Sequence, residues 1–372
     1  MKRLFQIILC LPLVLAAGCQ KETSEQGEKG GEFDEERIVH INASLSGPTN
    51  ATKAIVQGTD IPNKFSYGMF VCTHGSYGKH KENSWNLKAT YTAVEGSSAG
   101  TWSYQYVNNF TTGSLTPNLY ENVTITVKDN PTNPGVPVTA DIYAYAPYIQ
   151  EAFSGTPEAI PFTIADDISN QADLMYAVQN ATDDNKDLNP CSTDEIPLEA
   201  NFTFNHALAL LAFEFEILND NTNYRLRRIE VSKKNAVTAH LYKSGSFNAV
   251  TGKFNEGGDD VSSLIIKQPG TMIAPKEGTD MVAYMTLVPT PITEDDELVI
   301  TFFMNDSDSD AMALKPFVLK KAYVRHGDSD VYGFQGGYKY TFKFTLDNYL
   351  YLEGFSVQEW DEEIKTLESI EI

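Results

Sequence analysis

The sequence predicts an all-β fold made of β-sandwiches, and three observations carry this prediction. Most apolar segments alternate between apolar and polar side chains with a period of two. These segments are short, and the turn-forming residues Gly, Pro, Asn and Asp separate them. No segment keeps the helical period of about 3.6 residues over the length of a stable amphipathic helix. The 372 residues are enough for two domains of ordinary size.

Residues 1–18 have the features of a secretory signal peptide. Lys2 and Arg3 precede an apolar run over residues 4–15, which is too short to cross a bilayer as a permanent helix. Small residues follow at 16–18, and Cys19 comes directly after them. This arrangement resembles the lipobox of bacterial lipoproteins. The resemblance implies cleavage before Cys19, acyl chains such as palmitate on its thiol and new amine, and a soluble body tethered to the cell outer membrane.

Residues 19–37 are expected to form a flexible acidic tether. Phe33 is the only large apolar residue between Gln20 and Glu36, and the stretch is rich in Glu, Lys and Gly. Such a composition cannot bury enough apolar surface to fold. Its acidic residues resemble the stretch that marks surface-exported lipoproteins of some Gram-negative anaerobes. We therefore expect a surface-exposed lipoprotein.

The charge balance argues against one class of partner. The chain has a formal net charge of −22, and loss of Lys2 and Arg3 with the signal peptide changes it to −24. Such an acidic surface repels phosphate backbones and anionic membrane surfaces. We expect no nucleic acid as a partner, and we expect membrane contact to come from lipid.

Two cysteines are left in the mature body. Cys10 leaves with the signal peptide and Cys19 carries the lipid, so Cys72 and Cys191 are left. In an exported protein this pair fits either one disulfide or two free thiols. No Cys-x-x-Cys pair is present, so a structural zinc site has no support.

The clearest predicted strand covers residues 338–346 and follows a turn at Gly336-Gly337. Apolar residues share one face, and Lys and Thr share the other, which predicts a half-buried antiparallel strand. Residues 65–71 are more continuously apolar, which is typical of a strand covered on both faces, and residues 172–178 fit either a short helix or a strand. Further strands are expected at 38–45, 122–127, 298–303 and 355–360.

A domain boundary is predicted near residues 180–199, where the chain is polar and turn-forming. It divides the body into an N-terminal domain at 38–198 and a C-terminal domain at 199–372. Just after it, the parity of the apolar residues changes between His206 and Leu211, which predicts a bulge or a turn. His206 follows two inward-facing phenylalanines, so we expect a hydrogen-bonded histidine in the core or at the domain junction.

Motifs for catalysis or metal binding have little support. Residues 96–100 match Gly-x-Ser-x-Gly, but a strand-like segment follows where a nucleophile elbow needs a helix, so a hairpin turn is expected. The six histidines form no metal-binding motif, and residues 305–310 lack the Gly and the Glu of a calcium loop. We expect a protein that is not an enzyme and that has no cofactor and no metal.

Four segments, in order and behind the lipobox, resemble the fimbrillin family of pilus subunits. They are Ile142-Tyr-Ala-Tyr-Ala-Pro-Tyr148, Asp173-Leu-Met-Tyr-Ala177, Phe202-Thr-Phe-Asn-His-Ala-Leu208 and the terminal pattern Gly337-Tyr-Lys-Tyr … Val357-Gln-Glu-Trp360. The resemblance covers nearly the whole mature chain. It implies two tandem transthyretin-like β-sandwich domains with few short helices. It also implies a fimbrial subunit with a role in adhesion, which assembles with copies of itself or with minor fimbrial subunits.

The resemblance further implies processing by a trypsin-like protease. The protease cuts after a basic residue in the loop that follows the first strand, the first strand leaves, and a strand of a neighbour fills the groove. Lys53-Ala54 is the candidate cleavage site, although the family pattern has Arg there; Arg37 is the alternative, but it precedes the strand. The displaced strand is 38–45, with the apolar residues Ile38, Val39, Ile41 and Leu45. A cut subunit enters the fimbrium, and an uncut one keeps its lipid and resembles an anchor.

The C-terminal tail has two interpretations. Its apolar residues, separated by acidic ones, are Ile364, Leu367, Ile370 and Ile372. They fit a donor strand for a neighbouring subunit, and they fit equally a frayed chain end.

The alternative function is a monomeric surface lipoprotein that binds a glycan or a host ligand. Trp85, Trp102 or Tyr104, if exposed, would stack on sugar rings. The other interpretation places these aromatics in the sandwich core and in cross-strand pairs. One result separates the two functions: proteolysis makes a fimbrial subunit oligomerise and leaves a binder monomeric.

Overall fold

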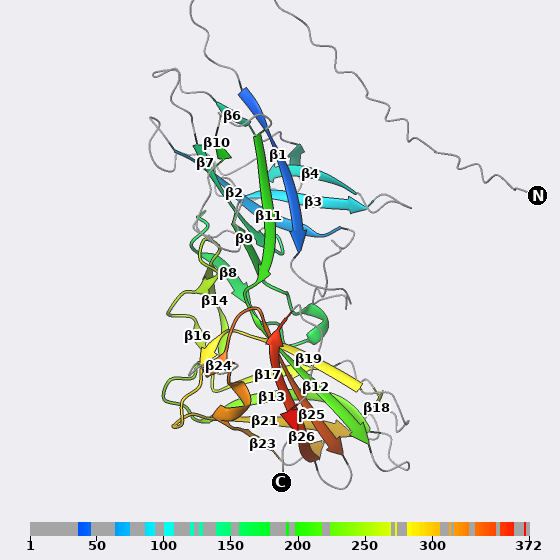
Figure 1. Ribbon diagram of the computed structural model, residues 1–372. Coiled ribbons are helices and arrows are strands. Elements are labelled where there is room, and N and C mark those ends of the chain that lie inside the picture. The colour runs from blue at the N-terminus through cyan, green and yellow to red at the C-terminus, as the bar shows by residue number, and fades with distance from the viewer. Residues whose placement is uncertain are drawn as a thin grey trace, which may run out of the picture.

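Figure 1 shows the fold in a computed structural model. The structure describes residues 36–45, 64–74, 86–93, 100–107, 120–122, 126–128, 139–149, 156–178, 191–192, 198–217, 224–268, 272–273, 281–305, 312–313, 316–326, 332–346, 350–360 and 368–369. In these residues the fold is all-β, as predicted, and the helices are two short 3-10 turns, η1 (Ile168–Asn170) and η2 (Lys321–Val324). No helix in this part of the chain has the length and apolar character needed to cross a membrane.

A ten-stranded sheet makes up the upper part of the elongated molecule in Figure 1. Its order is β5-β4-β3-β2-β7-β9-β11-β1-β6, and β10 pairs with β7. The strands are β1 (Glu36–Leu45), β2 (Ser66–His74), β3 (Leu87–Ala93), β4 (Gly100–Val107), β5 (Tyr120–Asn122), β6 (Thr126–Lys128), β7 (Thr139–Ala146), β9 (Met175–Val178), β10 (Cys191–Ser192) and β11 (Leu198–His206). The strands predicted at 38–45 and 65–71 are confirmed as β1 and β2, and segment 172–178 contains the strand β9.

The strand predicted at residues 122–127 is extended at both of its ends, at Asn122 and at residues 126–127, and residues 123–125 lie outside the described residues. Two strands share this segment: β5 pairs with β4 at one end of the sheet order, and β6 pairs with β1 at the other end. Alternating polarity predicts extended backbone, but it does not show where the chain changes partner. β3 and β4 are antiparallel, with Ala93 opposite Gly100, which agrees with the hairpin predicted at 96–100, although residues 94–99 lie outside the described residues.

Strand register separates the two cysteines of the body. Cys72 of β2 lies opposite Asp141 of β7, and Cys191 of β10 lies opposite Ala140 on the other edge of β7. Two strand spacings put the cysteines about 9–10 Å apart, whereas a disulfide needs Cα atoms within about 7 Å. Of the two states that fit the sequence, this geometry favours two free thiols.

The other sheets form the lower part of the molecule in Figure 1. The five-stranded sheet has the order β19-β12-β25-β26-β27, and the six-stranded sheet has the order β17-β13-β21-β22 with β18 on β13 and β23 on β21. The strands of these two sheets are β12 (Ala209–Ile217), β13 (Tyr224–Asn235), β17 (Ser263–Lys267), β18 (Met272–Ile273), β19 (Met281–Leu287), β21 (Glu297–Asn305), β22 (Met312–Ala313), β23 (Phe317–Leu319), β25 (Tyr338–Leu346), β26 (Leu350–Glu359) and β27 (Glu368–Ser369).

Two smaller sheets complete the lower part. In the first, β14 (Tyr242–Asn248) pairs with β8 (Ile160–Thr163), β15 (Lys253–Phe254) and β16 (Asp259–Asp260). In the second, β20 (Thr290–Pro291) pairs with β24 (Gly333–Phe334). β8 thus pairs with a strand that lies far along the chain.

The five- and six-stranded sheets pack face to face, as in a β-sandwich. Phe302 of β21 contacts three rings of the opposite sheet, with centroid distances of 5.2 Å to Phe213, 5.0 Å to Phe215 and 5.3 Å to Phe344. All four side chains are buried. This aromatic layer is the centre of the lower core, and its removal from water is the main force that holds the two sheets together.

β25 has the predicted bounds, but the prediction that it is half-buried is wrong. It lies between β12, to which it is parallel, and β26, to which it is antiparallel. Thr341 and Thr345, expected on the solvent face, are buried together with Ser356 of β26. The polar face of this central strand is therefore covered as well, which alternation within one strand cannot reveal. The strands predicted at 298–303 and 355–360 are confirmed within β21 and β26, although Trp360 lies one residue beyond β26.

The chain changes sheet at the predicted change of parity. β11 ends at His206 in the upper sheet, and β12 begins at Ala209 in the five-stranded sheet, so a turn lies between them. On β11 the buried side chains alternate as expected, with Phe202, Phe204 and His206 buried. The division into domains at residue 198 stays a prediction.

Candidate functional site

The strand β1 is paired along both of its edges. On one edge it runs parallel to β11, from Val39 opposite Leu198 to Leu45 opposite Phe204. On the other edge its first residues are antiparallel to β6, from Glu36 to Ile38. The next strand that the structure describes, β2, pairs with β3 and β7 and not with β1. Loss of β1 would therefore leave unpaired backbone N–H and C=O groups on β11 and β6.

The structure brings the predicted first-strand residues together in β1. Ile38, Val39, Ile41 and Leu45 all lie in this strand. Arg37 was expected to precede the strand, and this expectation is wrong: Arg37 is the second residue of β1 and lies opposite Val127 of β6. Because proteases bind unpaired extended backbone, cleavage at Arg37 needs the end of β1 to separate from β6 first.

The partner strand β11 contributes two buried aromatic side chains next to β1. Phe202, which lies opposite Ala43 of β1, and Phe204 are only 2% and 1% exposed. The ring of Phe204 contacts Tyr67 of β2 at a centroid distance of 5.1 Å and Phe65 at 5.8 Å. A strand that replaces β1 would pair with the backbone N–H and C=O groups of β11, the strand that carries these two buried rings.

Several predicted site residues lie outside the described residues. These are Cys19, Lys53, Ala54, Ile364, Leu367, Ile370 and Ile372. Within the tail, the short strand β27 pairs with the edge of β26, where Ser369 lies opposite Gly354 and Glu368 lies opposite Phe355. The described part of the tail therefore adds a strand to the five-stranded sheet of its own chain.

His206 is at the centre of a buried cluster that joins distant parts of the sequence. Its Nδ1 lies 3.0 Å from Oδ1 of Asp173, and its ring stacks on Trp360 with a centroid distance of 4.1 Å and an interplanar angle of 7°. All three side chains are buried. The prediction of a hydrogen-bonded junction histidine is confirmed, but its partners were missed. The partners, Asp173 and Trp360, come from the other family-like segments. In the sequence, a polar residue inside an apolar segment was the only indication of such a contact.

Backbone hydrogen bonds tie the same cluster to the turn between the sheets. The N–H of Trp360 donates to the carbonyl of Gly337 at 2.7 Å, and the N–H of Gly337 donates to the carbonyl of Leu208 at 2.9 Å. Gly337 has a φ of 77°, in the left-handed region that favours glycine. Three of the four family-like segments therefore meet at the junction of the upper and lower sheets.

A second buried contact crosses this junction. The side-chain oxygen of Gln171, which is 1% exposed, accepts hydrogen bonds from the N–H and the hydroxyl of Thr286 in β19, at 2.9 and 3.1 Å. Its amide nitrogen donates to the carbonyl of Ala165 at 3.2 Å. Because a buried amide is costly when unpaired, this geometry holds the segment before β9 against the five-stranded sheet.

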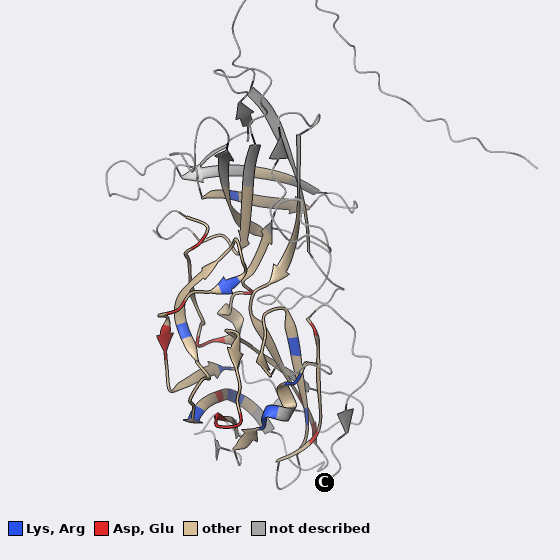
Figure 2. Cartoon of the chain, turned by 60° about the vertical axis from the view of Figure 1, so that its left-hand side comes forward, with Lys and Arg blue, Asp and Glu red and all other residues tan. Residues whose placement is uncertain are grey.

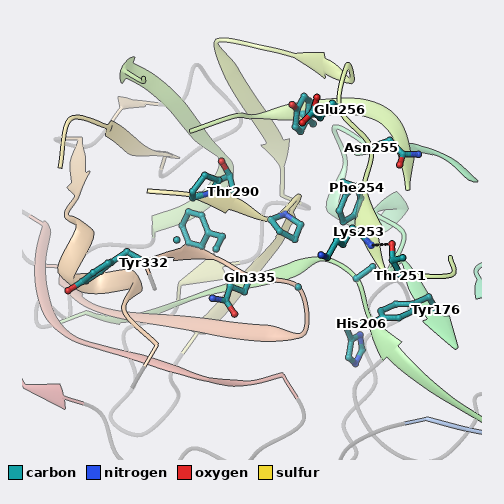
Figure 3. A pocket seen from close by; sticks show the side chains of 18 residues that line it. Tyr176, His206, Thr251, Lys253, Phe254, Asn255, Glu256, Thr290, Tyr332 and Gln335 are labelled. Atoms are coloured by element: carbon teal, nitrogen blue, oxygen red, sulfur yellow. Dashed lines mark hydrogen bonds between the residues drawn. The ribbon is translucent and has the colours of Figure 1, made fainter. Parts of the chain in front are cut away.

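A cleft of about 500 Å³ opens at the same junction. One wall is the turn and strand at residues 251–256, and the opposite wall is β20 with residues 332–336 (Figure 3). Tyr176 of β9 and His206 of β11 lie at one end of the cleft. Burial raises the pKa of Tyr176 above its ordinary value of 10.

Of the three aromatics considered for glycan stacking, Trp102 is the one whose side chain the structure describes, and it does not lie on an open surface. Trp102 of β4 is half-buried and packs on Tyr67 at 5.0 Å and on its cross-strand partner Tyr91 at 5.1 Å. This confirms for Trp102 the interpretation as a core and cross-strand aromatic. Tyr104 lies in β4, and Trp85 lies outside the described residues.

Charged groups form no candidate metal site in the described part of the chain. No group of three or more His, Cys, Asp or Glu side chains there is arranged to hold a metal ion. In the view of Figure 2, short blue segments of Lys and Arg lie along the chain, with red segments of Asp and Glu among them. His240 is paired with Asp260 at 2.9 Å and is exposed. The Asn-Asp-rich segment begins at Asn305, the last residue of β21, and residues 306–310 lie outside the described residues.

Comparison with known proteins agrees with this arrangement. The sequence model of the fimbrillin-like family matches residues 88–360. A solved "putative cell adhesion protein" from Bacteroides ovatus is 15% identical, with a TM-score of 0.52 over 89% of this chain and 100% of that chain, which supports the fold.

Two further solved structures are more distant. A protein of the same description from Bacteroides uniformis is 13% identical, with a TM-score of 0.48 over 89% of this chain and 100% of its own. The tip fimbrial protein Mfa3 from Porphyromonas gingivalis is 10% identical, with a TM-score of 0.41 over 88% and 100%. No curated protein matches the chain.

Proposed function

The chain belongs to the fimbrillin-like family, and from this premise we propose that it is a fimbrial subunit with a role in adhesion, exported as a lipoprotein on Cys19 and assembled by donor-strand exchange. Its partners in this proposal are other fimbrial subunits, a trypsin-like processing protease and the outer membrane, which it contacts through the lipid. The subunit moves from the outer membrane into the fimbrium once it is processed.

The observation that carries the proposal is the pairing of β1. This strand lies between β11 and β6, and its sequence neighbour β2 belongs elsewhere in the sheet. One break between residues 45 and 66 would therefore separate β1 from the rest of the body, with only non-covalent interactions left to hold it. The candidate bond Lys53-Ala54 lies in this interval.

In the proposed mechanism, the protease cuts after Lys53 and β1 leaves together with the tether and the lipid. The edge of β11 from Leu198 to Phe204 then has no partner, and an exposed strand edge of this length is a template for an added strand. The apolar tail of a neighbouring subunit, including Ile364, Leu367, Ile370 and Ile372, supplies that strand. Each subunit so filled offers its own tail to the next.

The test uses the chain from Gln20 onward, which lacks the candidate lipidated cysteine. Limited trypsin treatment is followed by intact mass measurement and size-exclusion chromatography. We expect cleavage after Lys53, release of a peptide that contains β1, and a ladder of oligomers. A variant that ends at Trp360 has no donor tail, and we expect it to be cut but to stay monomeric.

Two matched variants separate the candidate cleavage sites. Lys53→Ala should block both cleavage after residue 53 and oligomer formation, whereas Arg37→Ala should leave both intact. Oligomers that form equally well with Lys53→Ala, or a clean cut after Lys53 that leaves a stable monomer, would show that strand exchange triggered at this bond is not the assembly mechanism.

Lipid export is tested separately from assembly. Cells that express the full chain are labelled with a radioactive or clickable palmitate analogue, and the outer membrane is fractionated. We expect label on the wild type and none on Cys19→Ser, which should leave the membrane fraction. Label that persists on Cys19→Ser would place the lipid elsewhere.

A further inference from the structure

The cleft between residues 251–256 and residues 332–336 has the chemistry of a binding site for a neutral sugar. We propose that it binds a neutral hexose unit of an oligosaccharide. This inference goes beyond the proposed assembly function and does not depend on strand exchange, because no cleft residue belongs to β1 or to the tail. The volume of about 500 Å³ lies within the range of about 300–1,000 Å³ that is usual for small-molecule sites.

Close backbone packing shapes the cleft before any ligand binds. Gly252, with a φ of 68°, lies so near the ring of Tyr176 that a Cβ atom there would overlap the ring. Gly336 lies equally near the carbonyl of Ala207 on the opposite side. These contacts join the turn wall to β9 and the other wall to the β11–β12 turn. A site whose walls are already packed loses little conformational entropy on binding.

Some polar groups of the cleft already have partners in the fold. The amide nitrogen of Asn255 donates to the carbonyl of Glu158 at 2.8 Å and to the hydroxyl of Ser246 at 2.9 Å. The hydroxyl of Thr290 accepts from the N–H of His240 at 2.8 Å, and His206 is paired with Asp173. These side chains support the walls.

Three other polar side chains are left for a ligand. In the described residues, Gln335, Lys253 and Glu256 make no side-chain hydrogen bond and no ion pair, although all three line the cleft. Figure 3 shows Lys253 extending from its wall toward the wall that carries Gln335. The cleft therefore offers one amide, one ammonium and one carboxylate, which together provide donors and acceptors without net charge.

Half-buried rings supply the apolar part of the site. Tyr176, Tyr242 and Phe254 line the cleft beside these polar groups. A hexose has one face of C–H groups, which packs on aromatic rings, and a rim of hydroxyls that both donate and accept hydrogen bonds. A phosphate or another anion would meet Glu256 and a chain of net charge −22. A lipid tail would leave the three polar side chains unpaired.

The test uses the mature chain from Gln20 with β1 intact, and saturation-transfer NMR with the methyl glycosides of glucose, galactose, mannose and N-acetylglucosamine. We expect transfer to at least one of them, with a Kd near about 1 mM, the weak affinity of a single sugar unit. Gln335→Ala and Lys253→Ala should each weaken that binding by about tenfold. Lys234→Ala, an exposed lysine of β13 outside the cleft, is the matched control and should leave it unchanged.

Three results would overturn the proposal. The first is no transfer to any of the four glycosides. The second is transfer that Gln335→Ala and Lys253→Ala leave unchanged while circular dichroism shows both variants folded. The third is displacement of the bound glycoside by the dipeptide glycylglycine at equal concentration, which would make the cleft a peptide site. Because the protein stays uncut and monomeric in this experiment, failure here says nothing about assembly.

Discussion

Asp173, His206 and Trp360 are single residues from three segments that the sequence separates widely. Their contacts account for the presence of a histidine and an acid in otherwise apolar segments, because a buried polar group needs a partner close by. The stacking of His206 on Trp360 also places the start of the C-terminal tail at the junction between the sheets. A polar residue in an apolar segment thus indicates a buried contact, and the folded chain shows which residues make it.

At this scale we predict that His206→Ala lowers the free energy of unfolding by about 2–4 kcal/mol. The variant removes a buried ring that stacks on Trp360 and takes a hydrogen-bond partner from the Asp173 carboxyl. Urea denaturation measures the loss. The control His240→Ala changes an exposed histidine and should cost less than about 1 kcal/mol. Equal losses in the two variants would contradict a structural role for the junction cluster.

Asp296 is a single carboxylate with an unusual number of donors. It is 7% exposed, and it accepts hydrogen bonds from the backbone N–H groups of Val237, Thr238, Ala239 and Thr293 and from the hydroxyls of Thr238 and Thr293. Burial by itself raises the pKa of Asp296, but the bonds from Thr238 and Thr293 outweigh it and hold the pKa well below the ordinary 3.8. The charged form is therefore the form that the fold stabilises.

This shift predicts a loss of stability in acid. Because the pKa is lower in the folded chain than in the unfolded chain, the stabilisation is complete above the unfolded value of about 3.8 and decreases as pH falls below it toward the folded value. Asp296→Asn should be less stable than the wild type at pH 7 and should lose less on acidification. Urea unfolding at pH 7, 5, 4 and 3 measures both slopes. The control is Glu294→Gln, whose side chain is 85% exposed in the wild type, and its stability should change with pH as that of the wild type does. If the stability of Asp296→Asn falls with pH as steeply as that of the wild type, the lowered pKa of Asp296 is not a source of the acid sensitivity.

At the scale of elements, the pair β2–β7 shows how two strands share space. Gly68 of β2 lies opposite Tyr145 of β7, and a Cβ atom on Gly68 would overlap the tyrosine ring. Tyr145 is fully buried, and its hydroxyl donates to Asn86 at 2.7 Å. The glycine thus makes room for a ring from the neighbouring strand, which its own strand sequence does not reveal.

We predict that Gly68→Val costs about 1–3 kcal/mol through overpacking against Tyr145. Combined with Tyr145→Ala, which removes the ring, the loss should be smaller than the sum of the two single variants. The control pairs Gly68→Val with Phe302→Ala in the lower core, where the losses should add. Urea denaturation of all the variants gives the free energies of unfolding for this double-mutant cycle. Losses that add for the Gly68 and Tyr145 pair would rule out the steric contact.

At the scale of the whole molecule, one continuous buried core links the upper sheet to the lower ones. Phe70 and Tyr145 of the upper sheet belong to the same core cluster as Phe213, Phe302 and Phe344. The strand β8 comes early in the chain but pairs with β14 of the lower part, with Ile160 opposite Phe247. The two parts are therefore interlocked, whether or not the sequence divides into domains at residue 198.

This arrangement predicts a single cooperative thermal unfolding transition for the wild type. The calorimetric and van't Hoff enthalpies should agree. The double variant Gln171→Ala and His206→Ala weakens both junction contacts and should split the transition into two, whereas Lys234→Ala with Glu216→Gln, two exposed changes, should not. Two separate transitions in the wild type would mean that the two parts unfold independently in spite of the shared core.

Much of the secondary structure and part of the candidate site could be predicted from the chain alone. Period-two alternation located β1 and β25, a less regular alternation located β21, and a more continuous apolar run located β2, because the polarity pattern of its side chains is a property of the strand itself. The change of parity after His206 located the turn between the sheets. The segments that resemble the fimbrillin family pointed to the family that the comparison then confirmed.

Pairing, by contrast, was decided only by the tertiary structure. Asn122 pairs with β4 and residues 126–127 pair with β1 at the other end of the sheet order, Arg37 lies inside β1, and both faces of β25 are covered. The partners of His206 and the cleft at the junction also arise from segments far apart in the chain. A strand's own residues determine that it is extended and which face is apolar. Which strand lies beside it depends on the packing of the whole core, and no single segment carries that information.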